Sequence, residues 1–291
     1  MQIRNLAAFL PGEAAARVIA EGDQINEIRL RAERPVQFVY ASGDVFLKEI
    51  ISAQQLRRIA VAMMEHSYYA REGELAQGFF TMKNGFRVGV CGSFAEKQPG
   101  VFSMRAISSL CIRVARAVPG CAEDIAARMA AEHMKSTLIL SRPGMGKTTL
   151  LRDTARLLSE DGHAVGIADE RHEIAACRDG VPTMDVGPRT DVVDGCPKSQ
   201  AIMHLIRTMS PQVIITDEIG SRKDADAIRE AVRMGVAIAA SAHASSFEEF
   251  ESGSLGMLAR EGLFPLAFLL DGEPGKIAGI RRYDRRGNVC S

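Results

Sequence analysis

Tryptophan is absent from this 291-residue sequence, and aromatic residues make up only 5% of it. Proteins that bind single-stranded nucleic acids stack the bases on aromatic side chains along a basic groove. The formal net charge is zero, with a positive excess of only four over residues 1–120 and the opposite excess beyond them. The composition therefore argues against a nucleic-acid partner.

Long apolar runs are missing as well. No stretch reaches the roughly 18 apolar residues that indicate a transmembrane helix, and Met1–Leu6 leads into no apolar segment of signal-peptide length. The six cysteines form no C-x-x-C pair and no zinc-site spacing. We therefore expect a cytoplasmic chain with reduced thiols and no transmembrane segment of its own.

The order of the predicted elements divides the chain in two. Residues 1–120 read as strands and short helices without a nucleotide motif, and Asn84-Gly85 predicts a hairpin turn. Over residues 121–291, helices and strands alternate, which predicts a mainly parallel sheet with right-handed crossovers. In such a sheet, ligands bind at the carboxyl ends of the strands. The sequence thus predicts a smaller α+β domain (1–120) followed by an α/β domain (121–291).

The strongest motif is a phosphate-binding loop between the apolar run 137–140 and a predicted helix from Thr149. Its pattern, G-x-x-x-x-G-K-[ST], directs backbone N–H groups and Lys147 to phosphate oxygens and the Thr148 hydroxyl to Mg²⁺. Ser141 replaces the first glycine, so we expect altered nucleotide affinity rather than lost binding. The predicted nucleotide-binding residues are Ser141, Arg142, Pro143, Gly144, Met145, Gly146, Lys147, Thr148 and Thr149.

A second apolar strand, 213–216, ends in two adjacent carboxylates, Asp217 and Glu218. Neighbouring residues of a strand point to opposite sides, so the two side chains can have different functions. We predict that Asp217 holds Mg²⁺, directly or through water, and that Glu218 orients and deprotonates the attacking water. The alternative is that both acids cap the helix predicted from Asp224.

Other strand ends supply further candidates. Glu170 offers a carboxylate that could polarise water, and His243 could contact the γ-phosphate, although a lone histidine is more often an ordinary hydrogen-bonded residue. Phosphoryl transfer also needs positive charge, and an arginine from a neighbouring subunit can raise the rate by about 10³–10⁵-fold. The candidates are Arg171 and Arg189, then Arg87, Arg105, Arg113 and Arg116. For each of them, the alternative is an ordinary solvated or salt-bridged arginine.

Together these blocks resemble the stage III sporulation protein AA family, whose members are similar to the hexameric ATPases of type II and type IV secretion and pilus systems. The resemblance spans nearly the full length and departs from the family pattern at Ser141 and Arg142. It rests on Glu27-Ile28-Arg29-Leu30-Arg31, Gly85-Phe86-Arg87-Val88-Gly89-Val90, the phosphate-binding loop, Asp169-Glu170-Arg171, Asp185-Val186-Gly187, Asp194-Gly195-Cys196-Pro197-Lys198 and Asp217-Glu218-Ile219-Gly220.

The resemblance implies a RecA-like P-loop domain that binds ATP and Mg²⁺ and hydrolyses ATP. It also implies a homo-oligomer, by resemblance a hexameric ring, on the cytosolic face of a membrane complex of sporulating cells. It matches Lys147 and Thr148 to the phosphate and metal residues, Asp217 and Glu218 to the acidic pair, and His243 to the histidine of the secretion ATPases. Two alternatives are a motor stimulated by nucleic acid and a nucleotide-gated scaffold with little turnover.

Overall fold

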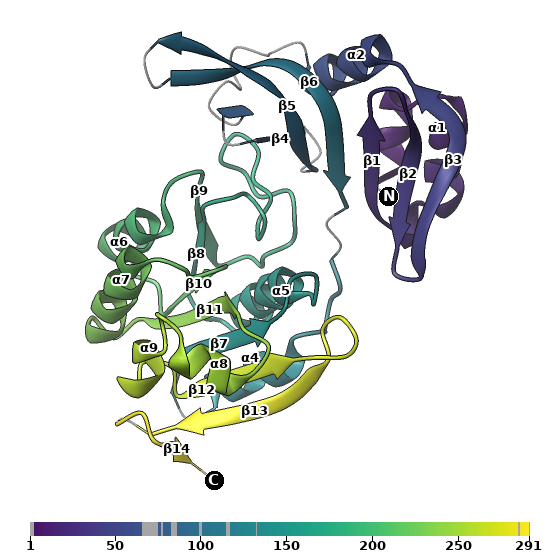
Figure 1. Cartoon of the computed structure of the whole chain (residues 1–291). Helices are drawn as coiled ribbons and strands as arrows, with labels where there is room; N and C mark the ends of the chain where they lie inside the picture. Colours follow the sequence, from purple (N-terminus) through teal and green to yellow (C-terminus); the bar gives the residue numbers. More distant parts are fainter. Residues whose placement is uncertain are drawn as a thin grey trace. The chain divides into compact units, whose positions relative to one another are not determined.

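The chain forms two compact units, Met1–Ala115 and Arg116–Ser291 (Figure 1). The computed structural model describes residues 3–65, 75–76, 78–82, 86–98, 101–114, 117–131, 133–284 and 286–290. Over these ranges, no helix is both long enough and apolar enough to cross a membrane. The turn predicted at Asn84-Gly85 lies outside the described residues.

The first unit is an antiparallel sheet with helices packed on one face. Its strands follow the order β3-β2-β1-β6-β5-β4. Ile28 of β1 pairs with Phe38 of β2 and with Ile112 of β6, so these buried side chains share the face that forms the core. The elements are η1 (Ile3–Phe9), α1 (Gly12–Glu21), η2 (Gly22–Gln24), β1 (Ile25–Arg31), β2 (Arg34–Tyr40), β3 (Gly43–Ile51), α2 (Ala53–Met63), β4 (Phe79–Thr81), β5 (Arg87–Gln98) and β6 (Val101–Arg113).

The second unit contains a mainly parallel sheet in the order β14-β13-β12-β7-β11-β10-β8-β9. The strands from β12 to β9 pair in parallel, and β13 and β14 pair antiparallel. The elements are α4 (Glu123–Ala130), β7 (Thr137–Ser141), α5 (Lys147–Glu160), β8 (Val165–Asp169), β9 (Thr190–Asp194), α6 (Lys198–Met209), β10 (Val213–Thr216), α7 (Arg222–Arg233), β11 (Ala237–His243), α8 (Phe247–Ser252), α9 (Met257–Arg260), β12 (Leu266–Leu270), β13 (Ile277–Tyr283) and β14 (Val289–Cys290).

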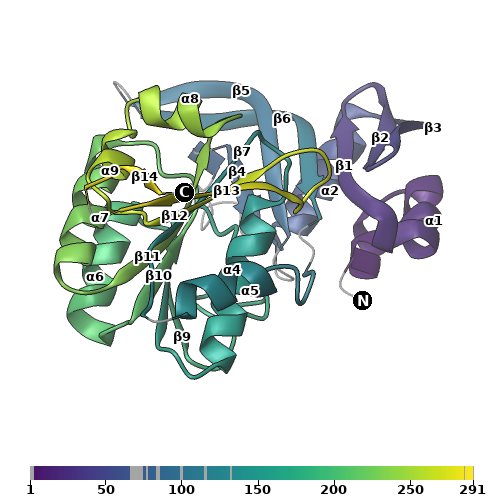
Figure 2. The ribbon, with the colours of Figure 1, turned by 90° about the horizontal axis from the view of Figure 1, so that it is seen from below.

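Helices cover both faces of this second sheet. Figure 2 shows α4 and α5 on one side of the strands and α6 and α7 on the other. On β7, Ile139 packs into the core under α4 and α5, whereas Leu138 and Leu140 pack into the core under α6 and α7. Burial on both faces explains why these strands read as apolar runs. The predicted site residues lie at the polar ends of these apolar strands.

Candidate functional site

Neighbouring strands bring the predicted site residues to one edge of the second sheet. The segment Ser141–Thr148 joins the end of β7 to the start of α5, Asp169 ends β8, Asp217 follows β10, and His243 ends β11. Strand β11 pairs with β7 on one side and with β10 on the other. His243 is therefore placed between the loop and the acidic pair.

The loop after β7 is closed around the side chain of Lys147. Its Nζ atom donates to the backbone oxygens of Ser141 (3.0 Å) and Arg142 (3.1 Å) and to the Ser141 hydroxyl (3.0 Å). Gly144 and Gly146 have φ angles of 79° and 85°, a left-handed conformation that glycine adopts without a steric cost. Helix α5 begins at Lys147, so its first amide groups have no intrahelical acceptor and can donate to an anion.

Ser141 fits the first position of the loop without backbone strain. It is the last residue of β7, paired with His243, and its φ angle lies outside the left-handed region. Its hydroxyl donates to the Arg142 carbonyl at 2.7 Å and accepts from Lys147. The serine thus adds an acceptor for the lysine that glycine would lack. Altered nucleotide affinity stays a prediction.

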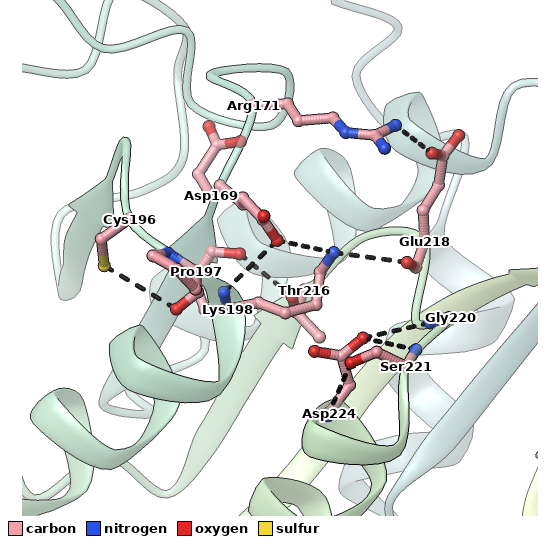
Figure 3. Close-up of polar contacts among 12 residues, drawn as sticks. Asp169, Arg171, Cys196, Pro197, Lys198, Thr216, Glu218, Gly220, Ser221 and Asp224 are labelled. Atoms are coloured by element: carbon pink, nitrogen blue, oxygen red, sulfur yellow. Dashed lines mark hydrogen bonds and ion pairs between the residues drawn. The ribbon is translucent and has the colours of Figure 1, made fainter. Parts of the chain in front are cut away.

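His243 connects this loop to the acidic strand. Its Nδ1 atom lies 3.2 Å from Lys147 Nζ, and its Nε2 atom lies 3.1 Å from Glu218 Oε1. Because an ammonium group can only donate, a hydrogen bond between Lys147 and His243 requires Nδ1 as the acceptor and leaves the ring proton on Nε2, which faces Glu218. Arg171 contacts the other oxygen of Glu218 at 2.5 Å (Figure 3). A continuous polar chain therefore runs from Lys147 through His243 and Glu218 to Arg171.

The two neighbouring carboxylates differ in pKa. Partial burial acts to raise the pKa of Glu218, but Arg171 and His243 outweigh it and lower that pKa. Burial raises the pKa of Asp217 to about 6, the Asp169 carboxylate adds to this effect, and Lys198 opposes it. Glu218 is thus firmly ionised at neutral pH, whereas Asp217 titrates close to it.

The surroundings of Asp217 fit a divalent cation. The residue is fully buried, and in the part of the chain that the structure describes neither carboxylate oxygen has a hydrogen-bond partner. Buried polar atoms without partners are costly, and carboxylate and hydroxyl oxygens are ligands that Mg²⁺ prefers. Thr148, the metal ligand predicted from the sequence, is half-buried in the first turn of α5, and its role stays a prediction.

The raised pKa of Asp217 predicts a pH-dependent stability difference for Asp217→Asn. A carboxyl whose pKa rises from 3.8 to about 6 on folding stabilises the fold fully below pH 3.8 and loses that contribution as the pH rises through 6. In metal-free buffer at pH 8, Asp217→Asn is therefore expected to be more stable than the wild type, by on the order of 2 kcal/mol.

Thermal unfolding from pH 4 to pH 8 measures this difference, which should shrink toward pH 4. The control is Asp179→Asn, because the Asp179 side chain is 87% exposed; its unfolding profile should follow the wild type. An Asp217→Asn protein no more stable than the wild type at pH 8 would contradict the prediction.

Glu170 is held at the site by a residue that sequence reasoning missed. Lys198, the first residue of α6, is only 5% exposed. Its Nζ atom lies 3.1 Å from Glu170 Oε2 and donates to the backbone oxygen of Glu218 at 3.3 Å (Figure 3). The polar segment before α6 gave no sign of this burial. These contacts place Glu170 at the site but do not test a catalytic role, which stays a prediction.

The segment after β8 is organised by two further residues, to which the sequence motifs assigned no role. The Asp169 carboxylate accepts from the backbone N–H groups of Glu173 (2.8 Å), Ile174 (3.1 Å) and Ala175 (2.9 Å). From α5, the buried Arg152 donates to the carbonyls of Ile174 (2.5 Å) and Glu173 (2.6 Å). The available signal was the position of Arg152 on the apolar face of a helix.

Arg189, the other predicted arginine among the described residues of the second unit, lies away from the polar chain. The backbone oxygen of Arg189 accepts from Val165, the first residue of β8, at the opposite edge of the sheet. Its guanidinium donates to the Ser159 carbonyl at 3.3 Å. A role in a neighbouring subunit stays a prediction for each arginine. In the first unit Arg87 lies over the Phe79 ring, Arg113 lies 3.8 Å from Glu27, Arg105 is exposed, and Arg116 falls outside the described residues.

The acidic pair does not cap the following helix, which was the alternative reading. Ser221 is the N-cap of α7, and its hydroxyl accepts from the Asp224 N–H at 3.1 Å. Asp224 in turn accepts from the N–H groups of Ser221 (2.9 Å) and Gly220 (3.1 Å). This capping box satisfies the helix start, so Asp217 and Glu218 are left for another function.

Crowding at Gly146 predicts a loop variant with impaired binding. The Met145 carbonyl accepts from the Gly275 N–H at 2.9 Å, and a Cβ atom on Gly146 would lie 3.3 Å from that nitrogen. Because φ there is 85°, we expect Gly146→Ala to lose about 1–2 kcal/mol of stability and to bind a fluorescent nucleotide more weakly.

Gly272→Ala is the matched control, since Gly272 has a φ angle of 80° and open space around its Cβ position. It should show a similar loss in thermal unfolding with unchanged nucleotide binding. Equal nucleotide binding by the two variants would contradict the expected crowding of the loop.

The fold is that of the secretion and pilus ATPases. The Legionella pneumophila ATPase DotB superposes with a TM-score of 0.60 at 17% identity, over 89% of this chain and 76% of that one. The pilus retraction motor PilT, solved with bound ADP, gives 0.58 at 14% identity, over 88% of this chain and 76% of that one.

By sequence, the chain belongs to the family described as "Sporulation stage III, protein AA", which it matches over residues 2–290. It is 39% identical over 274 residues to stage III sporulation protein AA of Bacillus subtilis (strain 168), covering 92% of this chain and 89% of that protein. An uncharacterized ycf45 protein of Porphyra purpurea is 37% identical over 145 residues, 49% of this chain and 25% of that one. The family predicted from the sequence is confirmed.

Proposed function

We propose that this chain is a Mg²⁺-dependent ATPase of the secretion-motor type, with a RecA-like P-loop domain as its nucleotide site. The observation that supports it best is the polar chain from Lys147 through His243 to Glu218. Beside this chain lies Asp217, whose two buried carboxylate oxygens have no hydrogen-bond partner among the described residues. A phosphate-binding lysine, a candidate metal ligand and a candidate general base thus meet at one edge of the sheet.

In this proposal each residue has a separate task. Lys147 and the N–H groups at the start of α5 bind the β and γ phosphates. Asp217 and Thr148 are the residues that would hold Mg²⁺, which when bound neutralises developing phosphate charge. Glu218, whose pKa is lowered, is ionised and can accept the proton of the attacking water. His243, in contact with Lys147 and Glu218, orients the base relative to the γ-phosphate.

We further propose that the protein works as a homo-oligomer, by resemblance a hexameric ring, on the cytosolic face of a membrane complex during sporulation. Family membership supports the sporulation context, and the shared fold with DotB and PilT supports a motor-type ATPase. The ion pair between Arg171 and Glu218 favours a second candidate. This ion pair holds the carboxylate that would act as the base and lowers its pKa. The second candidate is therefore a nucleotide-gated scaffold with little turnover.

The test is Mg²⁺-dependent ATP hydrolysis by the purified protein over a range of concentrations, with Lys147→Ala as the control. A specific activity above the control that rises with concentration would support sites completed between subunits. ATP binding without turnover at any concentration would favour the scaffold. A wild-type protein that neither binds nor hydrolyses ATP would overturn the proposal. A salt-dependent gain on adding single-stranded DNA or RNA would favour a nucleic-acid motor.

A further inference from the structure

The backbone of Glu218 adopts a conformation that is unfavourable for any residue with a Cβ atom. Its φ angle is 37°, within the left-handed region. Residues in such conformations persist only where the surrounding structure holds them, and they are concentrated at functional sites. The contacts of this one peptide segment therefore identify the residues that hold it.

Two residues from different elements hold this segment. Ser241 of β11 binds it on one side, because its hydroxyl accepts from the Glu218 N–H at 3.0 Å and its carbonyl accepts from the Ile219 N–H at 2.8 Å. Lys198 of α6 binds it on the other side, donating from Nζ to the Glu218 carbonyl at 3.3 Å (Figure 3). Both ends of the Glu218 backbone are thus fixed.

The burial of Lys198 makes this contact specific. A buried ammonium group is costly unless it is paired, and this one is paired with Glu170 at 3.1 Å while it donates to Glu218. Ser241 is fully buried as well. Neither side chain can therefore turn to solvent while the local structure is intact.

We propose that Lys198 and Ser241 are positioning residues that hold Glu218 in its left-handed backbone conformation and so direct its carboxylate toward His243. This inference rests on the proposed function, in which that carboxylate is the general base. Lys198 additionally ties Glu170 to the same peptide, so that two acidic residues from different strand ends move together. The sequence motifs assigned no role to either positioning residue.

The first test compares kinetics. Lys198→Met keeps the length and burial of the side chain but removes the donor. We expect kcat to fall by about 10- to 100-fold, as for a misplaced catalytic group, while KM for ATP changes little. Lys198→Arg, which keeps a donor, should recover part of the rate. A change in KM with kcat unaltered would overturn the positioning role. So would a Lys198→Arg rate no higher than that of Lys198→Met.

The second test needs no hydrolysis and so separates this inference from the proposed function. Thermal unfolding is measured for Lys198→Met in three backgrounds: wild type, Glu218→Gln and Glu218→Gly. Glutamine removes the charge but keeps the unfavourable φ angle, whereas glycine removes the need for a clamp. The loss of Tm should be similar in the wild-type and Glu218→Gln backgrounds and clearly smaller in the Glu218→Gly background.

The outcomes are distinct. Equal losses in all three backgrounds would overturn the clamp and leave Lys198 as a partner of Glu170 alone. A loss reduced equally by Glu218→Gln and Glu218→Gly would show charge attraction, and would also overturn the backbone role. Ser241→Ala in the same backgrounds gives an independent cycle should Lys198→Met not fold. A wild type without ATPase activity would remove the proposed function but leave these unfolding results readable.

Discussion

Replacing Glu218 with glutamine is expected to lower the rate of ATP hydrolysis by about 10²–10⁴-fold, the range for loss of a general base. The amide keeps the size of the side chain and can still accept from His243, but it cannot take a proton from water. Because Lys147 and the loop are untouched, nucleotide binding should persist. The measurement is single-turnover hydrolysis beside a binding titration, which separates chemistry from affinity.

Glu230→Gln is a suitable control for this variant, since Glu230 lies on α7 and pairs only with the exposed Arg233 among the described residues. Its rate should equal that of the wild type. A Glu218→Gln protein that hydrolyses ATP within a few fold of the wild type would transfer the role of base to another carboxylate, with Glu170 the first to examine.

Asp169→Ala is expected to cost the second unit about 3 kcal/mol of unfolding free energy. The substitution leaves three backbone N–H groups without their acceptor, each worth about 1–3 kcal/mol when buried. Part of this loss of stability is offset. Burial raises the pKa of Asp169, so its negative charge destabilises the folded state, and alanine removes that charge. Thermal unfolding should show a fall in Tm of roughly 6–12 °C.

Asp191→Ala provides the matched comparison for Asp169→Ala. Asp191 is an exposed residue of the edge strand β9, so the same chemical change there should move stability by less than about 0.5 kcal/mol. Should the two variants unfold at the same temperature, the carboxylate of Asp169 would not be the group that organises the segment after β8.

The sequence predicted the second sheet well because its central strands are buried on both faces. Each is an apolar run that ends at a polar residue, and in a parallel sheet those ends meet at one edge. The proximity of the loop, the acidic pair and His243 follows from this pattern alone. Strand β9 was missed, because an edge strand keeps polar residues such as Asp191 and Asp194 and has no apolar run to mark it.

The first sheet was predicted less completely. Strand β3 was not predicted at all. Most side chains of β3 are exposed, so its sequence lacks the alternation that marks a half-buried strand.

Contacts between distant segments were beyond the sequence for a different reason. Lys198 and Ser241 both reach Glu218, but nothing in the spacing of these residues records that their side chains meet. The partners of a buried charged side chain are known only from the folded structure.

The pairing of β11 with both β7 and β10 has a mechanical consequence. The backbone ladder joins Ser141 to His243 and Thr216 to Ala240, so the spacing between the phosphate-binding loop and the acidic pair is set by one intervening strand. Separating them would break a row of buried hydrogen bonds. Motion at this site is therefore expected in the segments beyond the strand ends, with the sheet itself as the fixed frame against which they move.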